Sequence, residues 1–257
     1  MHRHLSLVLV LAVAAACRTA TPVPSVPAPP PPTAAAAPAP SAAPIAAPPR
    51  IPEATRWIRD SAEHRAIFLQ VFRQATAFVE QAAAGRTPGT WAVVLDADET
   101  VIDNSLYQLE RAEAGSTYDR ESWRAWIARR EATPLPGAGA FLDRVRALGG
   151  RIVIVTNRNR SECPDTEAVF VAHRLAWDAM LCKPDGGPSE KNSRFEAVAA
   201  GTTAAGLPPL EIVAFVGDNI QDFPRLTQAV RLQGDEAFAA FGARYFVLPN
   251  PMYGSWN

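Results

Sequence analysis

The chain has 257 residues and a formal net charge of −1, from 25 Lys and Arg against 26 Asp and Glu. This balance excludes the strong basic excess that attracts nucleic-acid polymers, so we expect no such partner. Once a leader and a proline-rich segment are set aside, about 200 residues remain, which is enough for one domain with a substantial core.

The first 16 residues follow the plan of a signal peptide. A His-Arg-His start precedes an apolar run, Leu5–Ala16, that is too short to span a bilayer as a stable helix. Three alanines then precede Cys17, and small residues before a cysteine resemble a bacterial lipobox. We therefore predict a signal peptide over 1–16 and a lipidated Cys17, with ordinary cleavage after an alanine as the alternative. Arg18 stands where an aspartate typically signals inner-membrane retention, which favours an outer-membrane lipoprotein facing the periplasm or the surface.

A tether follows, over residues 17–53. Of the 24 prolines, 13 lie between Pro22 and Pro52, among alanines, serines, threonines and valines. Such a segment buries no core and favours an extended, polyproline-like chain. Its expected function is that of a tether that extends the reach of the folded domain, with a ligand for a proline-reading domain as the alternative. The folded domain is predicted over 54–257.

Residues 54–84 keep an apolar period near 3.6 and predict one or two packing helices, ended by Gly85 and Pro88. The run Trp91–Leu95 then predicts a strand buried on both faces. Asp96 and Asp98 come directly after it, and the period of two in a strand sends both carboxylates the same way. Like charges this close need a counter-ion, so a divalent metal is expected.

A helical insertion, predicted as a small cap over 107–135, contains Trp123 and Trp126 three residues apart on one helix face. We interpret Trp126 as part of a small satellite core. Trp123 is predicted to be a flat apolar wall over the active site.

A helix over 138–148 leads to a β-branched strand over 151–158, and a helix between two buried strands indicates a parallel sheet. Thr156 then lies beside Asp96 at the same level of the sheet edge. Cys163 and Cys182 are an even number once Cys17 is lipidated, which favours a disulfide in an oxidising compartment. Two reduced, buried thiols are the alternative.

Lys191 begins a further helix that should face the strand ends, and Lys183 is the second candidate for the same role. Another buried strand ends at Gly217, and Asp218 and Asp222 follow it. Carboxylate oxygens are the hard ligands that Mg²⁺ prefers. The chain closes with a strand over 244–248 and a segment that contains Tyr253.

Together these motifs resemble the HAD superfamily and, within it, the bacterial class C acid phosphatases, which include outer-membrane lipoprotein 5′-nucleotidases. The resemblance covers about residues 56–257, with Ala97 (often Leu in relatives) and Leu106 (often Pro) as departures. It is carried by Asp96-x-Asp98-Glu-Thr…Asp103-Asn-Ser, Thr156-Asn-Arg, Lys191, Gly217-Asp-Asn-x-x-Asp222-Phe and Leu248-Pro-Asn-Pro-Met-Tyr-Gly254. It implies an α/β fold: a HAD-like Rossmannoid parallel sheet with helices on both faces and a small helical cap.

The resemblance also implies roles. Asp96 is the expected nucleophile and Asp98 the general acid and base. Thr156 and the following Asn157 and Arg158 are expected to hold the phosphoryl group, and Lys191 to neutralise it. One Mg²⁺ is expected at Asp96, the backbone carbonyl of Asp98 and Asp218, with Asp222 nearby. The residues expected to flank the substrate ring are Tyr107, Trp123 and Tyr253.

The predicted function is a Mg²⁺-dependent acid phosphatase that hydrolyses 5′-nucleotides and related small phosphomonoesters through an aspartyl-phosphate. Two alternatives stay open at this stage. One is a phosphotransferase on the same fold, and the other is a non-catalytic lipoprotein scaffold. The lipid is the only expected membrane contact, and a homodimer is left open.

Overall fold

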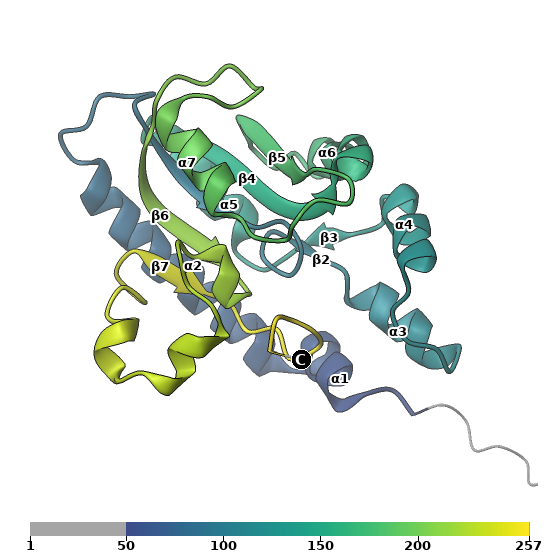
Figure 1. Cartoon of the computed structure of the whole chain (residues 1–257). Coiled ribbons are helices and arrows are strands. Elements are labelled where there is room, and N and C mark those ends of the chain that lie inside the picture. Colours follow the sequence, from purple (N-terminus) through teal and green to yellow (C-terminus); the bar gives the residue numbers. More distant parts are fainter. Residues whose placement is uncertain (1–49, 257) are drawn as a thin grey trace, which may run out of the picture. The chain divides into compact units, whose positions relative to one another are not determined.

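The computed structural model describes residues 50–256 (Figure 1). The predicted signal peptide, Cys17 and the tether up to residue 49 lie outside the described residues. Within residues 50–256, no helix combines the length and the apolar composition needed to cross a membrane.

A five-stranded parallel sheet forms the centre, in the order β5-β4-β1-β6-β7. The predicted α/β class with a parallel sheet is therefore confirmed. One strand, β5, was not predicted, because its sequence Ala-Met-Leu-Cys-Lys lacks β-branched residues. The strands are β1 (Trp91–Leu95), β4 (Arg151–Asn159), β5 (Ala179–Lys183), β6 (Glu211–Gly217) and β7 (Tyr245–Val247).

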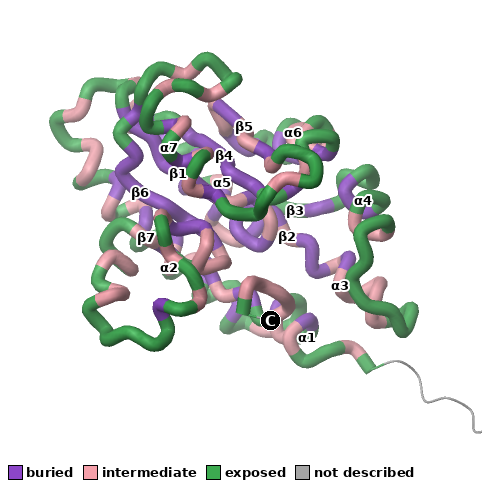
Figure 2. The backbone as a smooth tube through the Cα atoms, viewed as in Figure 1, coloured by how far each residue is buried: buried purple, intermediate pink, exposed green. Residues whose placement is uncertain are grey.

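Helices cover both faces of the sheet, and its strands are the most deeply buried part of the domain (Figure 2). Side chains along β1 alternate between two cores, as a period of two requires. Those of residues 91, 93 and 95 pack with α2 (Ala62–Ala83), α5 (Ala138–Ala147) and α6 (Cys163–Ala172). Those of residues 92 and 94 pack with α7 (Asn192–Ala200) on the other face. Burial on both faces fixes where β1 ends, and so where the first carboxylate of the motif lies.

The predicted N-terminal helical region is two helices, α1 (Glu53–Asp60) and α2. Ser61 separates them, and its hydroxyl accepts the backbone N–H of His64 at 3.1 Å, which caps α2. Short 3₁₀ segments also occur, at Arg160–Glu162 (η1), Ile220–Asp222 (η2), Gln228–Leu232 (η3) and Asp235–Phe238 (η4).

Two helices form the insertion after β1, namely α3 (Ser105–Glu113) and α4 (Arg120–Arg129). The strands β2 (Ile102–Asp103) and β3 (Thr133–Pro134) flank them and pair antiparallel, which brings the two ends of the insertion together. Asp119 caps α4 by accepting the N–H of Ser122 at 2.8 Å. In Figure 1, α3 and α4 stand to one side of the sheet, next to the ends of β2 and β3. We call residues 102–134 the cap.

Candidate active site

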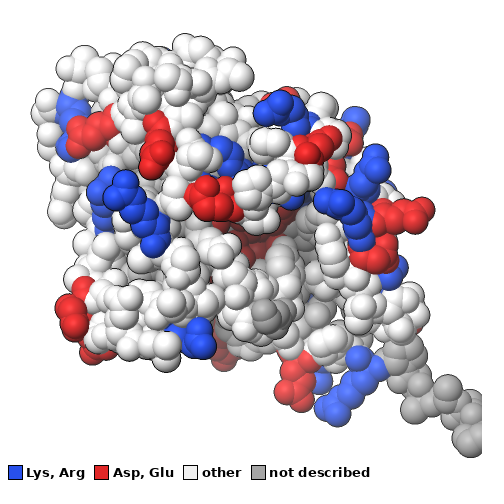
Figure 3. Space-filling view, viewed as in Figure 1, with Lys and Arg blue, Asp and Glu red and all other residues white. Residues whose placement is uncertain are grey.

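A cavity of about 1000 Å³ opens where the carboxyl ends of the central strands meet the cap and the C-terminal segment. Ligands of open α/β sheets bind at this edge. The space-filling view shows acidic atoms on the floor of a hollow in this face (Figure 3). The charged side chains that line the cavity from the strand ends and α7 are those of Asp96, Asp98, Arg158, Lys191, Asp218 and Asp222.

Lys191 lies between two carboxylates. Its Nζ donates to Asp96 Oδ1 at 2.7 Å and to Asp222 Oδ1 at 2.6 Å, and its side chain is 2% exposed. Burial alone would lower the pKa of Lys191, but the adjacent Asp222 and Asp96 carboxylates raise it to about 12. The lysine is therefore a fixed positive charge at any physiological pH. Lys183, the alternative candidate, lies on β5 and does not line the cavity.

Asp96 sits at the end of β1, where its backbone N–H donates to the carbonyl of Val216 on β6 at 3.0 Å. Its side chain is 11% exposed and faces the cavity. Burial raises the pKa of Asp96 to about 7, because the opposing effect of Lys191 is offset by the nearby Asp222 and Asp98. A carboxylate in such surroundings gains strongly from any added positive charge.

Three carboxylates could hold a metal ion: Asp96, Asp218 and Asp222 each place one oxygen within 4.8 Å of the others. The side chain of Asp218 receives neutral donors, Thr100 Oγ1 at 3.1 Å and Asn250 Nδ2 at 2.9 Å. Burial raises the pKa of Asp218 well above its usual range, and the neighbouring acids add to this. In the ionised form that binds a metal, the three carboxylates and one lysine carry an excess of two negative charges, since −3 plus +1 is −2. A divalent cation with oxygen ligands fits both the donor set and this charge.

Asp222 reaches this cluster because the neighbouring strand ends in a glycine. A Cβ at Gly217 would overlap the Asp222 side chain. The Asp222 Oδ2 atom also accepts the backbone N–H of Asn219 at 2.8 Å, which fixes the turn after β6.

Asp98 lies outside the three-carboxylate cluster and has its own cationic partner. Its Oδ1 accepts from Arg158 Nη2 at 2.7 Å, from Arg158 Nε at 2.9 Å and from Asn104 Nδ2 at 2.8 Å. Its Oδ2 accepts only a longer contact from Arg158 Nε, at 3.1 Å, among the residues that the structure describes. Oδ2 is therefore the oxygen of Asp98 that is more available to exchange a proton.

Of the residues near the end of β4 that were expected to hold the phosphoryl group, Asn157 and Arg158 line the cavity and Thr156 does not. Thr156 is fully buried, does not line the cavity, and its Oγ1 accepts the N–H of Arg158 at 3.2 Å. Arg158 was expected to contact the substrate, but its buried guanidinium is bound to Asp98. Asn157 lines the cavity, and its Oδ1 accepts from Arg194 at 2.7 Å.

Two of the three predicted aromatic contacts line the cavity, namely Trp123 and Tyr253. Tyr107 does not: it is 2% exposed and its hydroxyl pairs with Ser122 Oγ at 2.9 Å. Its ring packs edge-on against Trp123 with centroids 5.1 Å apart, so Tyr107 supports Trp123 from within the cap. Trp126 is buried, but it belongs to the same hydrophobic cluster as β1 and not to a separate satellite core.

Four residues to which the sequence assigned no role hold the site together. Asn104 joins Asp98 to the cap, because its Oδ1 accepts from Trp126 Nε1 at 2.8 Å and from Arg158 at 3.0 Å. Arg194 donates to the carbonyl of Thr156 at 2.5 Å. Its position one helical turn after Lys191 could have indicated it. The buried Glu99 accepts the N–H of Asn104 at 2.8 Å, and Asn250 binds Asp218.

Comparisons with known proteins agree with the resemblance drawn from the sequence. Residues 42–256 match the family model described as HAD superfamily, subfamily IIIB (acid phosphatase). The solved structure of the class C acid phosphatase from Bacillus anthracis is 30% identical, with a TM-score of 0.69 over 79% of this chain and 84% of that chain. The same enzyme with tungstate bound is 29% identical over the same shares, also with a TM-score of 0.69.

Proposed function

The chain belongs to the acid phosphatases of HAD subfamily IIIB, which makes it a phosphoric monoester hydrolase, and we propose that it is a Mg²⁺-dependent 5′-nucleotidase. The observation that carries the mechanism is the separation of two neighbouring carboxylates into different surroundings. Asp96 lies with Lys191 and two further acids, whereas Asp98 is paired with Arg158.

In the proposed first step, Asp96 attacks phosphorus in line with the ester oxygen. A bond forms between the Asp96 carboxylate and phosphorus, the bond to the ester oxygen breaks, and the leaving oxygen takes a proton from Asp98. In the second step, a water attacks the aspartyl-phosphate and gives its proton to Asp98, which releases phosphate and restores Asp96. Lys191 holds the Asp96 carboxylate in place throughout and offsets negative charge.

Mg²⁺ would be held by the carboxylates of Asp96 and Asp218 together with the backbone carbonyl of Asp98, with Asp222 nearby, and would neutralise the phosphoryl oxygens. Lys191 already bonds Asp222 Oδ1, so this carboxylate has one oxygen committed to the lysine. Its other oxygen holds the Asn219 N–H, which favours an orienting role for Asp222 over direct ligation.

Nucleotides as substrates are supported by the size and the walls of the cavity. A volume of about 1000 Å³ lies at the upper end for small-molecule sites and accommodates a nucleoside monophosphate. Trp123 and Tyr253 contribute aromatic rings to the cavity wall, and a base stacked on such a ring gains about 1–3 kcal/mol.

Phosphate release from the purified domain tests the proposal, with nucleoside monophosphates, nicotinamide mononucleotide and sugar phosphates as substrates. Asp96→Asn should lower kcat by on the order of 10³-fold or more, because it removes the nucleophile. Thorough chelation should abolish turnover until Mg²⁺ is restored. Asp143→Asn, an exposed change on α5, is the matched control. Retention of most activity in Asp96→Asn would contradict the mechanism, and transfer of phosphate to added alcohols would favour a phosphotransferase.

We also propose that the enzyme is exported and anchored through Cys17 in the outer membrane. The support is the sequence alone, namely the apolar leader and the alanines before the cysteine. Cys17→Ser should release the protein from the membrane fraction and abolish labelling by a fatty-acid analogue. A wild-type protein that is unlabelled and soluble in the periplasm would refute the anchor.

A further inference from the structure

We propose that the disulfide between Cys163 and Cys182 is a positioning element for the reaction. It holds the segment that carries Arg158, and Arg158 holds Asp98. The inference rests on the proposed function in one respect, the assignment of Asp98 as the proton donor.

Arg158 lies in a break in the pairing between β4 and β5. Thr156 pairs with Cys182, and the next pair is Asn159 with Lys183, so the ladder skips two residues on β4. Such a bulge bends the strand and re-aims its side chains. The bulge therefore turns Arg158 toward Asp98, but it also removes the ladder hydrogen bonds that would otherwise fix the backbone there.

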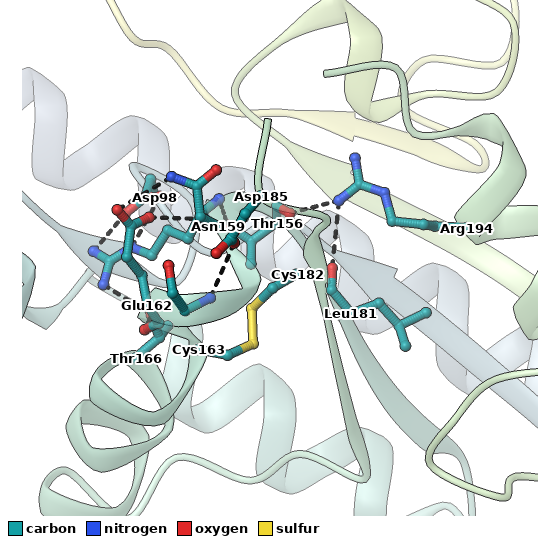
Figure 4. The surroundings of a disulfide bond; sticks show 12 residues. Asp98, Thr156, Asn159, Glu162, Cys163, Thr166, Leu181, Cys182, Asp185 and Arg194 are labelled. Atoms are coloured by element: carbon teal, nitrogen blue, oxygen red, sulfur yellow. Dashed lines mark hydrogen bonds and ion pairs between the residues drawn. A yellow bond between two sulfur atoms is a disulfide. The ribbon is translucent and has the colours of Figure 1, made fainter. Parts of the chain in front are cut away.

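The disulfide links the start of α6, which follows the bulge, to β5, which pairs with β4 on either side of the bulge (Figure 4). Cys182 pairs with the residue just before the bulge, and it is bonded to Cys163, the first residue of α6 after the bulge and η1. The Cα atoms of the two cysteines are 6.1 Å apart. In the short segment between the bulge and Cys163, just before the covalent loop of residues 163–182, the N–H of Asn159 donates to Glu162 Oε2 at 2.7 Å. The cross-link thus ties the start of α6 to β5, the strand next to β4, and Arg158 lies on β4.

Helix α6 contacts Arg158 directly. Thr166, one turn beyond Cys163, accepts from Arg158 Nη1 at 3.1 Å, and the Thr166 hydroxyl donates to the carbonyl of Glu162 at 3.0 Å. Arg158 is 2% exposed, so no bulk water can replace a lost partner. The other guanidinium nitrogens bind Asp98 and Asn104. The position of α6 is therefore transmitted through Thr166 to the guanidinium and from there to Asp98.

Asp98 needs this support because its two carboxylate oxygens have different hydrogen-bond partners, and a rotation of the carboxylate would exchange them. Arg158 and Asn104 together place three donors on Asp98 Oδ1 and leave Oδ2 with one long contact. If α6 moved away from the sheet, the guanidinium would shift and the Asp98 carboxylate could rotate. Misplacement of a catalytic group by about 1 Å can cost about 10²-fold in rate.

The test compares two substrates that differ in their need for an acid. Glycerol 2-phosphate expels an alkoxide that has to be protonated, whereas p-nitrophenyl phosphate expels a stable phenolate. Their kcat/KM values report the steps up to departure of the leaving group. The full chain is assayed as oxidised wild type, after reduction by a phosphine, and as Cys163→Ser/Cys182→Ser. The phosphine supplies two electrons and water supplies two protons, so the disulfide gives two thiols and the phosphine takes up the oxygen of the water to become its oxide. A thiol titration before and after treatment measures the reduction.

Loss of the disulfide should lower kcat/KM on glycerol 2-phosphate by about tenfold or more, while p-nitrophenyl phosphate changes by less than about threefold. Thr166→Val should produce the same selective loss without touching the cysteines, and Thr166→Ser should restore wild-type selectivity. The phosphine should not affect the double serine variant, which controls for its action elsewhere. Circular dichroism establishes that each species is folded.

Equal losses on the two substrates, or no loss after complete reduction, would overturn the inference. Asp98→Asn separates this failure from a failure of the proposed function. If Asp98→Asn is itself unselective between the two substrates, the assignment of Asp98 as proton donor is wrong. If Asp98→Asn is selective but reduction and Thr166→Val are not, only the positioning role of the disulfide is wrong.

Discussion

Trp123 is the residue whose replacement tests most directly whether the cavity prefers nucleotides. It lines the cavity from α4, and it is held from behind by the buried ring of Tyr107, 5.1 Å away between centroids. The guanidinium of Arg158 lies 5.6 Å from its ring centroid. The indole is therefore held in place before any substrate arrives, so stacking a base on it would cost little conformational entropy of the protein.

The magnitude depends on the contacts that Trp123→Ala removes. Stacking of a base on an aromatic ring contributes about 1–3 kcal/mol, and Tyr253 would retain part of the platform, so a loss near the lower end is expected. About 1.4 kcal/mol corresponds to a tenfold fall in kcat/KM for a nucleoside monophosphate. Glycerol 2-phosphate has no ring, so its kcat/KM should change by less than about twofold.

The assay is phosphate release under kcat/KM conditions on adenosine monophosphate and glycerol 2-phosphate, with melting temperatures measured in parallel. Trp177→Ala is the matched control, because Trp177 is also partly buried but packs on Phe170 away from the cavity. Selective loss in Trp123→Ala alone supports the stacking role. Equal losses on both substrates together with a lower melting temperature would refute it and make Trp123 a core residue of the cap.

Three further predictions concern stability. Lys191→Met should lower the free energy of unfolding of the metal-free protein by about 3–5 kcal/mol in urea titrations, because it leaves buried Asp222 without a cation; a loss below about 1 kcal/mol would contradict this. Burial lowers the pKa of His64 in the folded state. Below about pH 6.5 the unfolded state therefore binds more protons than the folded state, and the free energy of unfolding decreases as the pH is lowered. His64→Phe should flatten that fall between about pH 6.5 and 5 in the same titrations, and an unchanged slope would show that other groups cause it. Reduction of the disulfide between Cys163 and Cys182, 19 residues apart, should cost about 3 kcal/mol and lower the melting temperature, whereas an unchanged melting temperature would argue against a stabilising cross-link.

The sequence predicted the parts of the fold that depend on hydrophobic pattern. The run Trp91–Leu95 is buried on both faces and can only be a central strand, so the level of Asp96 at the sheet edge followed from the chain itself. The pattern failed for β5, whose edge position tolerates Met, Cys and Lys. It also could not show the bulge at residues 157 and 158, because bulges depend on pairing with a strand that had not been recognised.

The contacts within the site were less predictable than its location. Arg158 lies near the end of β4 at the active-site edge of the sheet, and the sequence predicted that it binds the phosphoryl group. In the structure its guanidinium instead forms a buried, charge-assisted ion pair with Asp98 at 2.7 Å. Tyr107 likewise belongs to the cap interior, because its hydroxyl finds a partner in Ser122. Such outcomes depend on rotamers and tertiary neighbours, which no linear spacing encodes.

The two acids of the first motif illustrate how one short segment can supply two different groups. Strand geometry ends at Leu95, and Glu99, with φ of 52°, turns the chain back into the cap. The period of two therefore no longer governs the residues after Asp96. Asp96 stays with the sheet and meets Lys191 from α7, whereas Asp98 is carried toward Arg158 on β4 and Asn104 of the cap. Such different surroundings support the different parts that we propose for these two groups in one reaction. A nucleophile needs the partner that fixes it and offsets charge, and a proton carrier needs one oxygen held and the other left accessible. Asp96 and Asp98 each have the surroundings that one of these parts requires.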